Sequence, residues 1–222
     1  MKKIYGFILA IALMVGGLTP ASAQKVPCGF SIQLGGLLPI QQFNDATTYF
    51  IPGANSMGNH GNAMFGASFG LKYNYRFDFG LGIFCSVDGM WNMLNKSARD
   101  LYDQASCTSP MYVNIPIMLG LSYISDFSYV FDVWAEAGAG CNLFWKTNEG
   151  WENNLTKYLW NPAFAAEGGI GVRFVKTISL GVHYYWLGKN NIKVEGVTYD
   201  STFNTPPKMK VGLLAFKLGL HF

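Results

Sequence analysis

Eight ionisable side chains recur at alternate positions of the chain and carry both signs of charge. They are Lys72, Asp88, Asp132, Glu136, Glu167, Arg173, His183 and Lys217. If the segments that carry them enclose a common interior, the charges could line a watery channel or pair into a polar plug. An isolated charge in a poorly hydrated space costs several kcal/mol. We therefore expect Glu136 and Glu167 to pair with Lys72, Arg173 or Lys217 and to plug the interior.

Groups that could support catalysis are few. Some small outer-membrane barrels are lipases, acyl transferases or proteases that use Ser, His and acidic side chains at the outer rim. Here His183 is expected inside, His60 in a long polar segment and His221 at the opposite end, so no two of them should converge. We expect no catalytic, cofactor-binding or metal-binding residues.

The four cysteines do not have metal-ligand spacing. Cys85 and Cys141 should lie on strands that are about 10 Å apart, beyond disulfide reach. Cys28 and Cys107 should lie at opposite ends of the molecule. We expect free thiols.

The elements that position these residues are strands with two unlike faces. Residues 64–75 alternate large apolar side chains with small or polar ones, which is the period of a β-strand. Similar alternation predicts three hairpins and two single strands, at 64–75 with 79–91, 112–124 with 131–143, 164–174 with 178–186, 29–38 and 211–222.

The connections between these strands alternate in length. Short turns fall near 76, 126 and 176, and long polar segments span 39–61, 94–109, 146–161 and 188–207. This pattern predicts an all-β, transmembrane, antiparallel up-and-down barrel of about 8 strands with periplasmic termini. Ten strands are possible if the first or third long segment contains a further hairpin. Pro116 should mark a bulge, because proline removes a ladder hydrogen bond.

The polar face is rich in Gly, Ser and Asn, which suits a crowded lumen better than a wet surface. The apolar face would then meet lipid. Aromatic residues gather near the strand ends, where interfacial girdles would lie, although aromatics also simply favour strands. The candidates are Tyr73, Tyr75, Phe79, Trp91, Tyr123, Phe131, Trp145, Phe174, Trp186 and Phe222.

Composition agrees with a membrane barrel. Charged residues make up 13% of the 222 residues and apolar residues 50%, whereas a soluble protein has roughly 25% charged residues. No later segment is a long apolar run, and no basic tract indicates nucleic acid. Residues 1–23 read as a signal peptide that ends at Ala21-Ser22-Ala23, which leaves 24–222 as the barrel domain.

The segment 112–119, Tyr-Val-Asn-Ile-Pro-Ile-Met-Leu, resembles a strand motif of the PorT-like outer-membrane β-barrel family of the Bacteroidetes. The Ala23-Gln24 junction and the terminal Phe222 resemble that family too, and Asn114 departs from its usual acidic residue. The resemblance covers essentially the mature chain. It implies a fold and an outer-membrane location more than an activity.

The sequence thus predicts a small outer-membrane barrel, not an enzyme, with a structural or interaction role in the cell envelope. Its surroundings would be outer-membrane lipid, and its long loops would display Tyr49, Trp151 and Trp160 to envelope proteins. The alternatives are a narrow passive channel and a lipid-modifying enzyme.

Overall fold

The computed structural model describes residues 29–45, 61–77, 80–125, 130–151, 154–198 and 206–222. Eight long strands dominate it, and they form a closed barrel in the order β1-β10-β9-β8-β5-β4-β3-β2. Their bounds are β1 Gly29–Ile40, β2 Ala63–Arg76, β3 Leu81–Leu94, β4 Met111–Ser125, β5 Phe131–Lys146, β8 Asn161–Phe174, β9 Ile178–Asn191 and β10 Lys208–His221.

The barrel closes where the first strand meets the last. β1 and β10 pair antiparallel from Ser31 opposite His221 to Ile40 opposite Gly212. Closure leaves no free sheet edge, which is the condition for strands to lie in lipid. The predicted fold class is confirmed.

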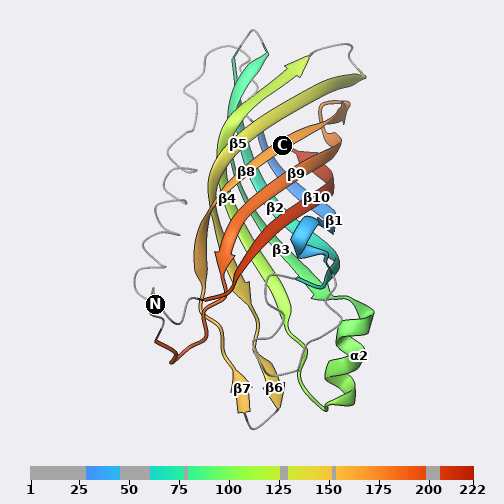
Figure 1. Ribbon diagram of the computed structural model, residues 1–222. Helices are drawn as coiled ribbons and strands as arrows, with labels where there is room; N and C mark the ends of the chain where they lie inside the picture. Colours follow the sequence, from blue (N-terminus) through green and yellow to red (C-terminus); the bar gives the residue numbers. More distant parts are fainter. Residues whose placement is uncertain (1–28, 46–60, 78–79, 126–129, 152–153, 199–205) are drawn as a thin grey trace.

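The two ends of the barrel differ (Figure 1). At one end, which we call the loop end, lie the 3-10 helix η1 (Gln41–Phe43), the helix α2 (Lys96–Gln104) and the hairpin of β6 (Glu149–Trp151) and β7 (Asn154–Thr156). The other end, the turn end, has the short connections and the C-terminus. Because β6 and β7 form a separate two-stranded sheet, the barrel keeps eight strands.

The loop-end helix was not predicted, although its start has a recognisable signal. Asn95 precedes the helix, and its side chain accepts a hydrogen bond from the backbone N–H of Ala98 at 2.8 Å. Such a cap satisfies one of the first free N–H groups of a helix. No helix in the described part of the chain is long and apolar enough to cross a membrane.

The prediction of a bulge at Pro116 is wrong. Pro116 pairs with Asn142 of β5 in an unbroken register. Towards β3, Val87 pairs with Ile117 and Met90 with Asn114 in one constant register, but the two pairs between them are missing. Proline has no N–H to donate, so the ladder opens locally without an inserted residue.

Side chains alternate between the lumen and the outer surface as predicted. Within the eight strands, most charged side chains turn inward and are buried or nearly so; the exceptions are Lys189, Lys208 and Lys210, which are exposed near the loop end. The outward positions between the ends are instead large and apolar, with examples such as Phe65, Leu119, Phe164, Ile170 and Phe216. The barrel is therefore apolar outside and polar inside.

The apolar core lies at the loop end. Phe43 packs edge-on against Tyr112 with ring centroids 5.2 Å apart, and Tyr112 stacks on Phe144 at 6.0 Å. Leu94, Tyr102 and other buried side chains of the strands and α2 join the same cluster. We call this cluster the loop-end core.

Candidate functional site: a filled lumen beneath an ordered loop end

Three ion pairs lie inside the barrel: two cross the lumen between strands that are not neighbours, and the third joins the neighbouring strands β5 and β8. Lys72 of β2 contacts Glu136 of β5. The remaining two pairs join an aspartate to a cation on another strand. They are Lys217 with Asp88 at 2.5 Å and Arg173 with Asp132 at 2.6 Å.

These pairs differ in part from the expected ones. Glu136 has a lysine partner among the residues proposed for it, but Arg173 and Lys217 contact the aspartates instead. Glu167 makes no ion pair with any described residue. Alternation places a residue on a face, but it cannot say how far a side chain reaches across a barrel.

Tyr185 contacts both members of the Lys217–Asp88 pair and also hydrogen-bonds Glu167, and it was not among the predicted site residues. Its hydroxyl accepts a hydrogen bond from the Lys217 ammonium at 2.8 Å and lies 3.2 Å from the Asp88 carboxylate. Lys217 also donates to the side-chain oxygen of Gln33 at 3.2 Å. The signal was available, because Tyr185 lies two positions after His183 and so shares its face.

Bulky rings occupy the remaining lumen space. Lys72 lies over the ring of Phe84 at 4.4 Å and over that of Trp134 at 5.6 Å. A side chain at Gly171 would place its Cβ 2.5 Å from the Trp134 ring, so glycine is needed there for the indole to fit. The interior of an eight-stranded barrel is just wide enough for side chains to fill, and here they do so at this level.

A second polar cluster lies at the loop end, around Glu149 of β6. This carboxylate is 0% exposed; Lys146 donates to it at 2.8 Å, and the hydroxyls of Tyr102 and Tyr158 donate as well. Burial, and then the nearby Glu149 charge, raise the pKa of Tyr102 well above its ordinary value. We call these four residues the Glu149 cluster; it ties α2, β5 and the β6–β7 hairpin together.

Sequence reasoning missed the Glu149 cluster. Lys146, Glu149 and Tyr158 fall in the segment expected to be a long polar loop, and Tyr102 falls in another. A lysine three residues before a glutamate is common on solvated loops, so nothing in the sequence indicated that the pair is buried.

Two arrangements resemble parts of a hydrolase. Gly66-Ala-Ser68-Phe-Gly70 matches the Gly-x-Ser-x-Gly pattern of a nucleophile elbow, but it lies within β2 and Ser68 is buried in the lumen. A nucleophile elbow requires a sharp strand-to-helix turn. Ser179 and His221 approach within 2.8 Å at the turn end, a contact that the sequence analysis did not foresee.

Exposed apolar side chains recur in the segment 151–160, which follows Glu149 in the sequence. Trp151 is 50% exposed and Trp160 is 48% exposed, and Leu155 and Leu159 between them are exposed too. Trp160 stacks on Trp145 with ring centroids 5.2 Å apart. We call Trp151, Leu155, Leu159 and Trp160 the apolar loop face; Tyr49 lies outside the described residues.

The predicted girdle residues mostly lie on the outer surface at the strand ends. Tyr73 and Trp145 are half-buried, and Phe79 lies outside the described residues. The exposed ones are Tyr75, Tyr123, Phe131, Phe174 and Phe222 towards the turn end, and Trp91 and Trp186 towards the loop end.

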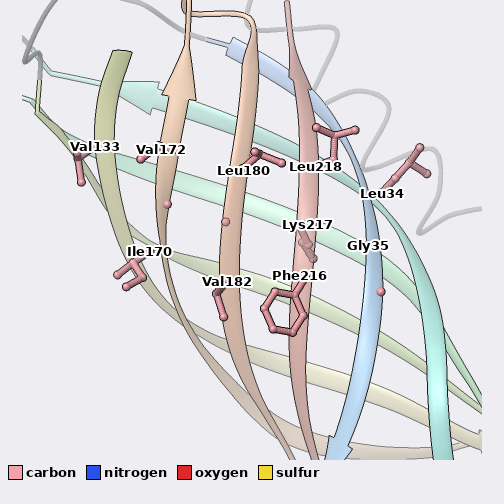
Figure 2. A pocket seen from close by; sticks show the side chains of 13 residues that line it. Leu34, Gly35, Val133, Ile170, Val172, Leu180, Val182, Phe216, Lys217 and Leu218 are labelled. Carbon is pink, nitrogen blue, oxygen red and sulfur yellow. The ribbon is translucent and has the colours of Figure 1, made fainter.

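A shallow groove of about 820 Å³ lies on the outer wall across β1, β5, β8, β9 and β10 (Figure 2). Ile170, Val182 and Phe216 are among the apolar side chains around it. Its lining matches the apolar character of the rest of the wall.

The thiols are free in the described part of the chain. Cys85 and Cys141 are exposed on β3 and β5, with β4 between them. Cys107 is buried in the loop-end core. Cys28 lies outside the described residues.

No protein-family model matches the chain, and no curated protein sequence is similar to it. Among solved structures, the chain is similar to Ail, the attachment invasion locus protein of Yersinia pestis, with 12% identity over 88% of this chain and 99% of that one and a TM-score of 0.49. OprG from Pseudomonas aeruginosa gives 12% identity, coverages of 89% and 97%, and a TM-score of 0.49. Neisserial surface protein A gives 15% identity over 87% of this chain and 97% of that one, with a TM-score of 0.45. Likenesses this distant do not define what the chain does.

Proposed function

We propose that this chain is an integral outer-membrane barrel that carries out no reaction, holds a rigid loop platform outside the cell and binds envelope partners through it. The termini would face the periplasm, as the short turns do in outer-membrane barrels. The apolar outer wall supports the membrane location, because lipid-facing charges are costly and the wall between the strand ends is apolar. The PorT-like resemblance agrees with this location.

The interaction role is supported by a contrast at the loop end between the buried Glu149 cluster and the exposed apolar loop face. The Glu149 cluster fastens α2 and the β6–β7 hairpin from below, while the apolar loop face above it is exposed. Mobile loops would not need a buried ion pair beneath them. Exposed aromatic side chains on a fixed scaffold are typical of binding surfaces.

The test is co-purification after mild crosslinking of the full chain in its native membranes. We expect partner proteins with the wild type and a loss of these partners with Trp151→Ala combined with Trp160→Ala. Trp91→Ala is the matched control, since it removes an exposed tryptophan from the barrel wall. Equal recovery with both variants, or no partner with the wild type, would refute the proposal.

A narrow passive channel is the main alternative, and the filled lumen speaks against it. The three ion pairs, Phe84 and Trp134 occupy the interior, and the loop-end core occupies it towards the loop end. We expect no steady conductance when the purified barrel is inserted into planar bilayers. Large and stable currents would favour the channel.

A lipid-modifying enzyme has less support. His183 is buried in the lumen, away from the acyl chains that surround the wall. We expect lipid hydrolysis by the purified protein to be absent, and unchanged by His183→Ala. Activity that disappears with His183→Ala would establish the enzyme instead.

A further inference from the structure

We infer that Glu136, Glu167 and His183 form a binding site for one divalent cation of the zinc class inside the lumen. The sequence analysis expected no metal site, and the inference is independent of the role of the loops. It rests on two observations: how the strands bring the residues together, and which of their atoms are free.

The strand register brings the three side chains together. Glu136 of β5 lies opposite Gly169 of β8, and Gly169 lies opposite His183 of β9. Glu167 lies two positions before Gly169 and so points to the same face. One ligand atom from each of the three residues lies within 4.8 Å of the other two.

Gly169 makes the room that the imidazole uses. A Cβ at this position would lie 2.6 Å from Nδ1 of His183. The ring therefore rests against bare backbone between the two glutamate-bearing strands. A larger residue at Gly169 would push the imidazole away from both carboxylates.

The donor atoms of the three residues are free. His183 is 1% exposed, and neither of its ring nitrogens makes a hydrogen bond. Oε1 of Glu167 is also buried without a hydrogen-bond partner. Buried polar atoms are nearly always paired, so three free ones beside each other point to a missing ligand.

Glu136 can serve the site without giving up its lysine. Lys72 contacts its Oε2, while its Oε1 lies 3.4 Å from Nδ1 of His183 without suitable hydrogen-bond geometry. A cation would take Oε1 and leave Lys72 on Oε2. Carboxylate ligands in metal sites are commonly held in this way by a second polar partner.

Glu167 differs from the other lumen carboxylates in its partners. Asp88, Asp132 and Glu136 each contact a lysine or arginine, whereas Glu167 is a hydrogen-bond partner of the Tyr185 hydroxyl and makes no ion pair with a described residue. A proton on Glu167 would neutralise it but would leave both imidazole nitrogens unsatisfied. A metal ion satisfies the free carboxylate oxygen and one nitrogen together.

The mixed ligand set selects the class of metal. Mg²⁺ and Ca²⁺ prefer oxygen ligands alone, whereas imidazole with carboxylates suits zinc and similar transition metals. Zinc ligands lie about 2.0–2.2 Å from the ion, so two of them are about 4 Å apart at most. Small rotations of the glutamate side chains close the remaining gap.

The test is to fold the full chain into detergent micelles with Zn²⁺ present, remove free metal by gel filtration and measure bound zinc. Folding with Zn²⁺ present avoids any barrier to entry through the filled lumen. We expect about one zinc ion per barrel, and a d–d absorption band when Co²⁺ replaces Zn²⁺. Glu167→Gln and His183→Gln should each weaken zinc binding by at least about 10-fold to 100-fold.

Glu195→Gln is the matched control, because Glu195 is an exposed loop acid. It should bind zinc as the wild type does. Circular dichroism of each variant reports whether the barrel has folded, and only folded samples are compared. A folded wild type without zinc, or equal zinc in Glu167→Gln, His183→Gln and the control, would overturn the inference.

Discussion

Two buried glutamates of this barrel have opposite surroundings. Glu149 at the loop end is 0% exposed and has one lysine and two tyrosine hydroxyls as partners. Glu167 in the lumen is 6% exposed, makes no ion pair with a described residue and has one oxygen without a hydrogen bond. Both carboxylates are buried, but within the described part of the chain only Glu149 has an ion pair, while Glu167 has the Tyr185 hydroxyl as a hydrogen-bond partner and keeps one oxygen free.

This difference in surroundings suggests a structural role for Glu149 and a binding role for Glu167. A buried carboxylate with a full set of partners fastens the elements that supply them, here α2, β5 and the β6–β7 hairpin. A buried carboxylate with one oxygen still unpaired keeps its capacity to bind something else. The Glu149 cluster is therefore expected to be essential for stability, whereas Glu167 should be dispensable for it.

The sharpest test of this comparison is Glu149→Ala. The substitution leaves the Lys146 ammonium buried without its carboxylate, and breaking a buried pair in this way costs about 3–5 kcal/mol. We expect that decrease in the free energy of unfolding, measured by denaturant titration in detergent micelles. Glu195→Ala should change the unfolding free energy little, and a similar small change for Glu149→Ala would remove the distinction.

Tyr102→Phe should have the next largest effect. It removes one hydroxyl that donates to a buried carboxylate, and a hydrogen bond to a charged group contributes about 1.5–3 kcal/mol. Titrations of both proteins in denaturant measure the loss. If Tyr102→Phe is as stable as the wild type, α2 is not fastened through Glu149.

The same tyrosine predicts a pH dependence. Its folded-state pKa lies above the ordinary value of 10.0, so its contribution to stability is complete below pH 10 and is lost as the pH rises further. We expect the stability difference between wild type and Tyr102→Phe to shrink above that pH. A constant difference would mean that Tyr102 does not titrate as its surroundings require.

Asn95→Ala tests whether the helix positions Tyr102. Loss of the cap on α2 should cost about 1 kcal/mol. If α2 acts through Glu149, the cost should fall when Tyr102 is already phenylalanine, because neighbouring sites that share a partner are not additive. Additive costs from a double-mutant cycle would show that the helix and the cluster are independent.

The smallest effect is expected for Glu167→Gln in metal-free buffer. The amide keeps the shape of the side chain and its capacity to hydrogen-bond Tyr185, and it removes a buried charge that makes no ion pair with a described residue. Stability should therefore stay within about 1 kcal/mol of the wild type or rise. Denaturant titration after chelator treatment measures this. A loss as large as that of Glu149→Ala would mean that Glu167 is compensated as fully as Glu149.

Particular elements show how far the sequence alone reaches. The alternation in 64–75 predicts β2 (Ala63–Arg76) to within one residue at each end. Strands that end at the loop end run further than predicted: β9 continues to Asn191 beyond the expected 186. The last residues of these strands are mostly polar, so the alternation of apolar and polar residues no longer distinguishes a strand from a loop there.

The sequence by itself indicated the barrel, because a period of two with one apolar face and one face of small and polar residues, joined by alternately short and long connections, is typical of strands that close in lipid. It also determined which charges point inward, since alternation assigns a face to every residue. Only the tertiary structure decided which charges meet, why Glu149 is buried beneath the loops, and that Glu136, Glu167 and His183 come together. Those contacts depend on strand register and side-chain reach across a lumen, and neither is a local property of the chain.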